Sequence, residues 1–94
     1  MIVIDSQSRQ PIYEQIVEHV ESLIAAGVMS QGEQLPSVRA LAVELSINPN
    51  TIQKAYAILE EHGAIYPVKG KGNFVAGKGN YLGQKQRELL SRME

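Results

Sequence analysis

Short polar side chains that can hydrogen-bond to nucleic-acid bases cluster in one stretch of this 94-residue sequence, between positions 48 and 54. The stretch contains Asn48, Asn50, Thr51, Gln53 and Lys54. Asparagine and glutamine carry paired donor and acceptor groups, which match the edge that adenine presents in the major groove of DNA. The cluster therefore predicts a surface that reads bases.

A second group, Lys69-Gly70-Lys71, places a glycine between two lysines. Lysine can neutralise phosphates, and glycine lets the backbone approach a groove wall closely. The run lacks the Gly-x-x-x-x-Gly-Lys-Ser/Thr spacing of a nucleotide-binding loop, so we do not expect nucleotide binding. It fits a phosphate-contacting tip instead.

Catalytic and metal-binding chemistry has little material in the sequence. There is no Cys, which excludes disulfides, thiolate zinc sites and cysteine nucleophiles and fits a reducing compartment. We expect His19 at the surface and His62 at a helix C-terminus, where the helix dipole favours positive charge. A chain of this size buries only about 60 to 65% of its unfolded surface and has no room for a deep substrate cavity. We therefore predict no enzyme, no cofactor and no metal site.

Charge is distributed unevenly along the chain, although the net charge is only −1. Residues 1–36 hold one Arg against five acidic residues, a net charge of −4, whereas residues 37–94 hold eight Lys or Arg against five Glu, a net charge of +3. Such a polarised chain can present one basic face to a polyanion, and a merely uneven solvated surface is the alternative.

Apolar spacing predicts three amphipathic helices after a lead-in, residues 1–10, that could be a strand or an arm. The first helix runs from about position 11 to 27. The second follows Ser37, whose hydroxyl can cap it, and the third follows Asn48, with Tyr56 on its buried stripe. His62 and Gly63 close the third helix.

The pattern changes after position 63 to two short apolar runs, 65–68 and 74–75, separated by residues 69–72. This arrangement predicts a β-hairpin with a basic, glycine-rich tip. Pro67 has no N–H for a ladder, so its strand should lie at an edge.

The order of elements is that of a winged helix-turn-helix, a mainly α fold with a three-helix core and a small β-hairpin as the wing. We assign residues 1–76 to this DNA-binding domain. Residues 77–94 are predicted to form a linker and the start of a C-terminal dimerisation helix.

Several motifs in register resemble the N-terminal DNA-binding domain of GntR-family bacterial transcription regulators. These motifs are Leu35-Pro36-Ser37-Val38-Arg39-Ala40-Leu41-Ala42, Asn48-Pro49-Asn50-Thr51-Ile52-Gln53-Lys54-Ala55-Tyr56, Leu59-Glu60, Gly63 and Lys69-Gly70-Lys71-Gly72-Asn73-Phe74-Val75. The third-helix run and Pro11-Ile12-Tyr13-Glu14-Gln15-Ile16 are most similar to the YtrA-type branch. That resemblance implies a minimal regulator, in which a winged helix is followed by a short helical tail that pairs two subunits.

The resemblance also implies which residues read DNA: Arg39 in the second helix, the first residues of the third helix, and Gly70 at the wing tip. With the phosphate contacts expected from the chemistry above, the predicted DNA-contacting residues are Ser37, Arg39, Asn48, Asn50, Thr51, Gln53, Lys54, Lys69, Gly70 and Lys71. Alternatively, Arg39 could form a salt bridge with a neighbouring Glu, and Lys54 could be merely solvated. Other family members carry Arg where this chain has Pro49 and Gln53, which predicts a less guanine-directed readout.

These observations predict a cytoplasmic, sequence-specific transcription regulator, a repressor that binds an inverted-repeat operator on double-stranded DNA as a homodimer. No run approaches 18 apolar residues, so no membrane segment is expected. One alternative is the DNA-reading module of a longer regulator with an aminotransferase-like, pyridoxal-phosphate-binding domain. Another is a winged helix that contacts protein or RNA.

Overall fold

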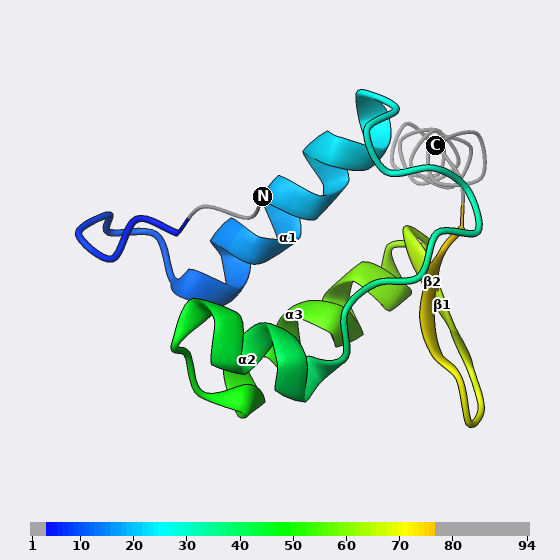
Figure 1. Cartoon of the computed structure of the whole chain (residues 1–94). Helices are drawn as coiled ribbons and strands as arrows, with labels where there is room; N and C mark the ends of the chain where they lie inside the picture. Colours follow the sequence, from blue (N-terminus) through cyan, green and yellow to red (C-terminus); the bar gives the residue numbers. More distant parts are fainter. Residues whose placement is uncertain (1–3, 77–94) are drawn as a thin grey trace, which may run out of the picture.

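The computed structural model describes residues 4–76, and it has the predicted winged helix-turn-helix architecture (Figure 1). Its elements are α1 (Ile12–Ala25), α2 (Val38–Leu45), α3 (Pro49–Glu61), β1 (Ile65–Val68) and β2 (Gly72–Val75). The linker and C-terminal helix predicted for residues 77–94 lie outside the described residues.

The helix ends follow the capping chemistry of the sequence. Ser37 Oγ accepts a hydrogen bond from the backbone N–H of Ala40 at 3.0 Å, and Asn48 Oδ1 accepts one from the N–H of Asn50 at 2.8 Å. Each cap satisfies an N–H that has no partner inside its own helix. Ser46, with φ of 55°, ends α2 in the left-handed conformation and turns the chain into α3.

The core lies where α1 crosses α3 and where α2 and the hairpin close its sides (Figure 1). Its largest fully buried side chains are Ile16, Val20, Ile24, Leu41, Ile52, Leu59, Ile65 and Val75. Tyr56 is also buried, as predicted, and its ring packs in the same cluster. Every helix and both strands therefore contribute to one hydrophobic centre.

The hairpin turn is one residue shorter than predicted. Gly72 pairs with Val68 and belongs to β2, and the Lys71 N–H donates to the Val68 carbonyl at 2.9 Å to close a turn of residues 69–71. The prediction placed Gly72 in the tip because the second apolar run begins only at Phe74, whereas β2 begins at Gly72.

An extended segment, residues 32–35, runs antiparallel along the free side of β2. The Gly32 N–H donates to the Val75 carbonyl at 2.8 Å, and the Val75 N–H donates to the Glu33 carbonyl at 2.9 Å. The Leu35 N–H donates to the Asn73 carbonyl at 2.9 Å. Because this segment covers β2, β1 is the outer strand. The edge position predicted from Pro67 is confirmed.

Of the two alternatives predicted for the lead-in, a strand or an arm, the strand is wrong for residues 4–10, which form a turn and bends. Gln15 fixes this turn from α1: its Oε1 accepts from the Asp5 N–H at 2.8 Å, and its Nε2 donates to the carbonyls of Asp5 and Gln10. No helix in the described ranges is long and apolar enough to cross a membrane.

Candidate nucleic-acid interface

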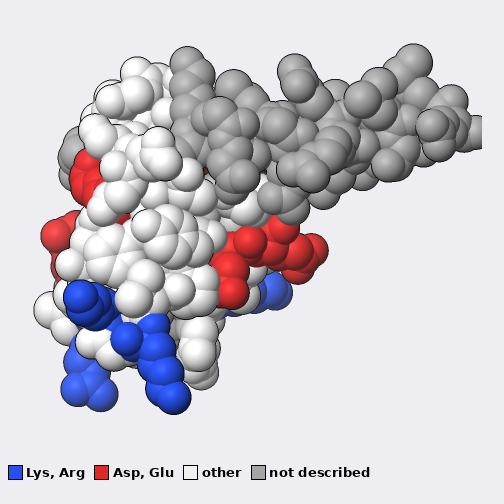
Figure 2. All heavy atoms as spheres, turned by 90° about the vertical axis from the view of Figure 1, so that its right-hand side faces the viewer, with Lys and Arg blue, Asp and Glu red and all other residues white. Residues whose placement is uncertain are grey.

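Three turns that carry the predicted DNA-contacting residues lie along the lower edge of the molecule in Figure 1: the first turn of α2, the first turn of α3 and the turn of the hairpin. We call this surface the recognition edge. It consists of Ser37, Arg39, Asn48, Asn50, Thr51, Gln53, Lys69, Gly70 and Lys71. Figure 2, which shows the hairpin side of the molecule, has Lys and Arg side chains gathered at this lower end and acidic side chains above them.

On α2, Ser37 and Arg39 are both exposed. The Ser37 oxygen accepts the capping bond, which leaves its hydroxyl hydrogen available to donate to a phosphate. Arg39 forms no ion pair with another residue of the range 4–76, so the alternative of a salt bridge to a neighbouring Glu is not what the structure shows. Its guanidinium is free to bind an external acceptor.

On α3, Asn50 and Gln53 are exposed near the start of the helix, whereas Thr51 is half-buried. Asn48 uses one lone pair of its side-chain oxygen for the cap, which leaves both amide hydrogens available to a ligand. The N-terminus of α3 adds partial positive charge at the same place. This first turn therefore offers mixed donors and acceptors to bases, and mainly donors to phosphates.

Lys54 points toward α1. Its Nζ lies 4.0 Å from the centroid of the Tyr13 ring, in a cation–π contact. At an exposed site such a contact contributes about 0.5–1 kcal/mol, so it competes only weakly with a phosphate. Spacing along the chain does not predict this pairing, because the two residues lie on different helices.

At the wing tip, Lys69, Gly70 and Lys71 are all exposed. Gly70 has φ of +79°, and a Cβ built there meets no atom within 4 Å. The turn therefore requires glycine at this position for its backbone conformation rather than for space. The hairpin behind the tip is stiffened by Tyr66 and Phe74, whose stacked rings are 5.9 Å apart between centroids.

Sequence reasoning missed two long-range contacts. Gln34 Nε2 donates to the Lys71 carbonyl at 2.7 Å, at the wing turn. His62, which caps α3 as expected, also has its Nδ1 2.6 Å from Glu21 Oε2 on α1. Neither pair could be found from spacing along the chain.

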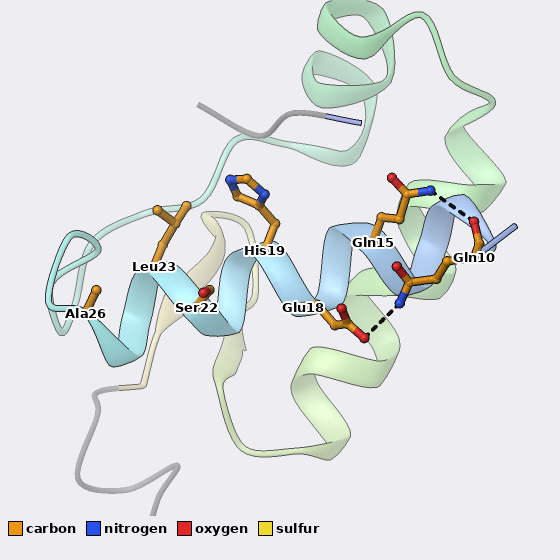
Figure 3. A pocket seen from close by; sticks show the side chains of 7 residues that line it. All are labelled: Gln10, Gln15, Glu18, His19, Ser22, Leu23 and Ala26. Carbon is orange, nitrogen blue, oxygen red and sulfur yellow. Dashed lines mark hydrogen bonds between the residues drawn. The ribbon is translucent and has the colours of Figure 1, made fainter. Parts of the chain in front are cut away.

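The outer side of α1 holds an open polar hollow (Figure 3). His19, half-buried, lines it together with Gln10, whose Nε2 donates to Glu18 Oε2 at 2.7 Å. The hollow contains no part of the recognition edge. Within residues 4–76, no three His, Asp or Glu side chains are grouped so that they could hold a metal ion.

Comparison with known proteins identifies relatives of this fold and this sequence. The family model described as "Bacterial regulatory proteins, gntR family" matches residues 12–75. The HTH-type transcriptional repressor YtrA of Bacillus subtilis is 46% identical over 81% of this chain and 58% of its own length. This chain thus spans a little over half of that relative.

Solved structures agree with the sequence match. YtrA from Sulfolobus acidocaldarius, a GntR-family transcription factor, superposes with a TM-score of 0.76 at 37% identity, covering 96% of this chain and 97% of that one. The DNA-binding domain of AraR, solved in complex with operator ORR3, superposes with a TM-score of 0.68 at 31% identity, over 79% of this chain and 89% of that one. The family match confirms the prediction of a regulator rather than an enzyme. The chain belongs to the gntR family of bacterial regulatory proteins and carries a DNA-binding winged helix-turn-helix of the YtrA-like type.

Proposed function

We propose that this protein is a sequence-specific transcription repressor that binds an inverted-repeat operator as a homodimer. The observation that carries the proposal is the recognition edge, where three separate turns bring unpaired donors and cations to one side of the molecule. Two relatives support it: the B. subtilis YtrA is a transcriptional repressor, and the AraR domain was solved on an operator.

The proposal divides the contacts by their chemistry. Phosphate contacts, which fix register on the duplex, come from Ser37, Lys54, Lys69 and Lys71. Base contacts, which give specificity, come from Arg39, Asn48, Asn50, Thr51 and Gln53, with Gly70 bringing the wing backbone into a groove. The first group makes binding sensitive to salt, and the second makes it sensitive to sequence.

Pairing of two chains follows from the small size of the recognition edge. One domain touches too few base pairs to be selective in a genome, whereas a two-fold pair doubles the contacts and fixes the spacing of half-sites. We assign the pairing to residues 77–94, beyond the winged helix of residues 1–76, and we place the protein in the cytoplasm, where an operator is accessible.

The test is an anisotropy titration of the full chain against the promoter region of its own operon, with a scrambled duplex as competitor. If two subunits neutralise roughly six to ten phosphates, affinity should fall about 10³- to 10⁵-fold between 50 and 200 mM salt. Selective, salt-sensitive binding to an inverted repeat supports the proposal. Equal affinity for both duplexes, or a flat salt response, contradicts it.

Matched variants locate the specificity. Arg39→Ala and Gln53→Ala should abolish preference for the operator while leaving thermal unfolding unchanged, because both side chains are exposed. The control is Gln7→Ala, an equally exposed amide in the N-terminal turn, away from the recognition edge. Retained operator preference in both edge variants would mean that Arg39 and Gln53 do not read the operator. A parent chain without operator preference would favour a winged helix that contacts protein or RNA.

A further inference from the structure

The turn of the wing is held by a side chain from a distant part of the chain. Gln34 Nε2 donates to the Lys71 carbonyl oxygen at 2.7 Å, although 37 positions separate the two residues. Within residues 4–76, no other side chain donates to the turn of residues 69–71. The base of the hairpin is fixed by the core and by residues 32–35, whereas the exposed turn at its tip has this one side-chain anchor among the described residues.

Gln34 reaches this position because its own backbone is already fixed beside β2. The neighbouring Leu35 N–H donates to the Asn73 carbonyl at 2.9 Å, and Gln34 itself forms a bridge with Phe74. Because this bridge lies close to the turn, the Gln34 side chain can reach the Lys71 carbonyl. The anchor is therefore built on a rigid base.

Gly72 supplies the space for the amide. Its φ is +123°, and a Cβ built on it would lie 3.1 Å from Gln34 Nε2. By contrast, a Cβ on Gly70 would meet nothing within 4 Å. Both its positive φ and the passage of Gln34 therefore favour glycine at position 72.

The same segment also leads into α2. Pro36 accepts the Tyr56 hydroxyl hydrogen bond at 2.7 Å, and Ser37 caps α2 directly afterwards. One short stretch of chain thus holds both the wing tip and the first turn of α2. The two ends of this stretch therefore set where Lys69 and Lys71 lie relative to Arg39.

We propose that Gln34 is a positioning residue for the wing: its amide holds the turn so that Lys69 and Lys71 project toward DNA phosphates at the same time as α2 and α3 enter the groove. This inference rests on the proposed function and adds a specific residue to it. Gln34 acts through the Lys71 carbonyl, and its own contact with DNA is not required.

The test compares Gln34→Met with Gln31→Met. The first keeps the length of the side chain and removes the donor, and the second changes an exposed glutamine of the same loop whose side chain makes no hydrogen bond to the hairpin in the described residues. Gln34 is exposed, so both variants should unfold at the parent's temperature. Backbone ¹⁵N relaxation of Gly70 and Lys71 is measured first, in the free protein. We expect faster, larger motion of the tip in Gln34→Met only.

Binding is then measured from 50 to 200 mM salt. Each lost phosphate contact changes the slope of log K against log salt by about 0.9, so Gln34→Met should make the slope shallower by about 1 to 2 per subunit. In a Lys69→Gln/Lys71→Gln background the same substitution should have no further effect, because the charges that it positions are gone.

Two results would overturn the inference. If the motion of Gly70 and Lys71 is the same in Gln34→Met as in the parent, the amide does not hold the turn. If Gln34→Met lowers DNA affinity further in the Lys69→Gln/Lys71→Gln background, Gln34 contacts DNA itself. If the parent chain shows no selective DNA binding, the proposed function fails, and the relaxation data alone still decide whether Gln34 fixes the tip.

Discussion

Tyr56 donates its hydroxyl hydrogen to the carbonyl oxygen of Pro36 across 2.7 Å, which ties the middle of α3 to the residue that precedes the cap of α2. Only 4% of Tyr56 is exposed. Desolvation by burial, with a smaller contribution from the Glu44 carboxylate, raises the pKa of Tyr56 from 10.0 to about 12. The spacing of the two reading helices therefore depends on a buried phenol that must stay protonated.

This pKa predicts a loss of stability in alkali. Below pH 10 both the folded and the unfolded tyrosine are protonated, and the stabilisation is fully present. Between pH 10 and about 12 only the unfolded state gives up its proton, so the free energy of unfolding should fall by up to about 1.4 kcal/mol per pH unit. Urea unfolding at several alkaline pH values measures this decline.

Tyr56→Phe is the control for the alkaline decline. It removes the ionisable group and should weaken the protein at neutral pH by about 1–3 kcal/mol, because the Pro36 carbonyl loses its donor. The difference between the parent and the variant should shrink as the pH rises above 10. A constant difference up to pH 12 would show that Tyr56 does not titrate as its burial implies.

Ser37 caps α2, and the proposed function gives it a second role, the donation of its hydroxyl hydrogen to a phosphate. Ser37→Ala should lower the free energy of unfolding by about 0.5–2 kcal/mol, because the Ala40 N–H loses its acceptor. Ser37→Asp keeps the cap but places a negative charge at the recognition edge. It should unfold like the parent and bind DNA more weakly. Parent-like DNA affinity in Ser37→Asp would exclude Ser37 from the phosphate contacts.

Lys54 should contribute less to the salt dependence of DNA binding than Lys69. The Lys54 ammonium lies over the Tyr13 ring, and this contact competes with any phosphate. Lys54→Ala is therefore expected to change the slope of log K against log salt less than Lys69→Ala does. In a Tyr13→Leu background the two lysines should become more alike. Equal slopes for both lysine variants in the parent would contradict this ranking.

The two glycines of the wing should differ in their tolerance of a side chain. Gly70→Ala forces alanine into the left-handed region and should cost about 1–2 kcal/mol. Gly72→Ala should cost more, because it adds a close contact with Gln34 Nε2 to a backbone strain of its own. Thermal unfolding of both variants measures the difference. If Gly70→Ala is the more damaging, the close packing of Gln34 against Gly72 is not energetically important.

Local chemistry made much of this protein predictable. Ser37 and Asn48 were identified as caps because a cap needs only a suitable side chain two or three residues before the N–H that it accepts. The buried stripe of α3, including Tyr56, followed from helical spacing alone. The candidate phosphate contacts also came from side-chain chemistry, whereas Arg39, the first residues of α3 and Gly70 were predicted to read DNA from the resemblance to the GntR family.

Contacts between distant segments were decided only by the tertiary structure. The N-terminal residues form a turn because Gln15 binds Asp5 and Gln10, which no spacing rule for strands includes. Gly72 belongs to β2 because it pairs with Val68 across the hairpin, and Lys54 lies over Tyr13 because α1 packs against α3. The sequence by itself determined approximately where the helices begin and end and which side chains are candidates for contact with DNA. Their common edge, and the anchoring of the wing by Gln34, arise from the packing of segments that are far apart in the chain.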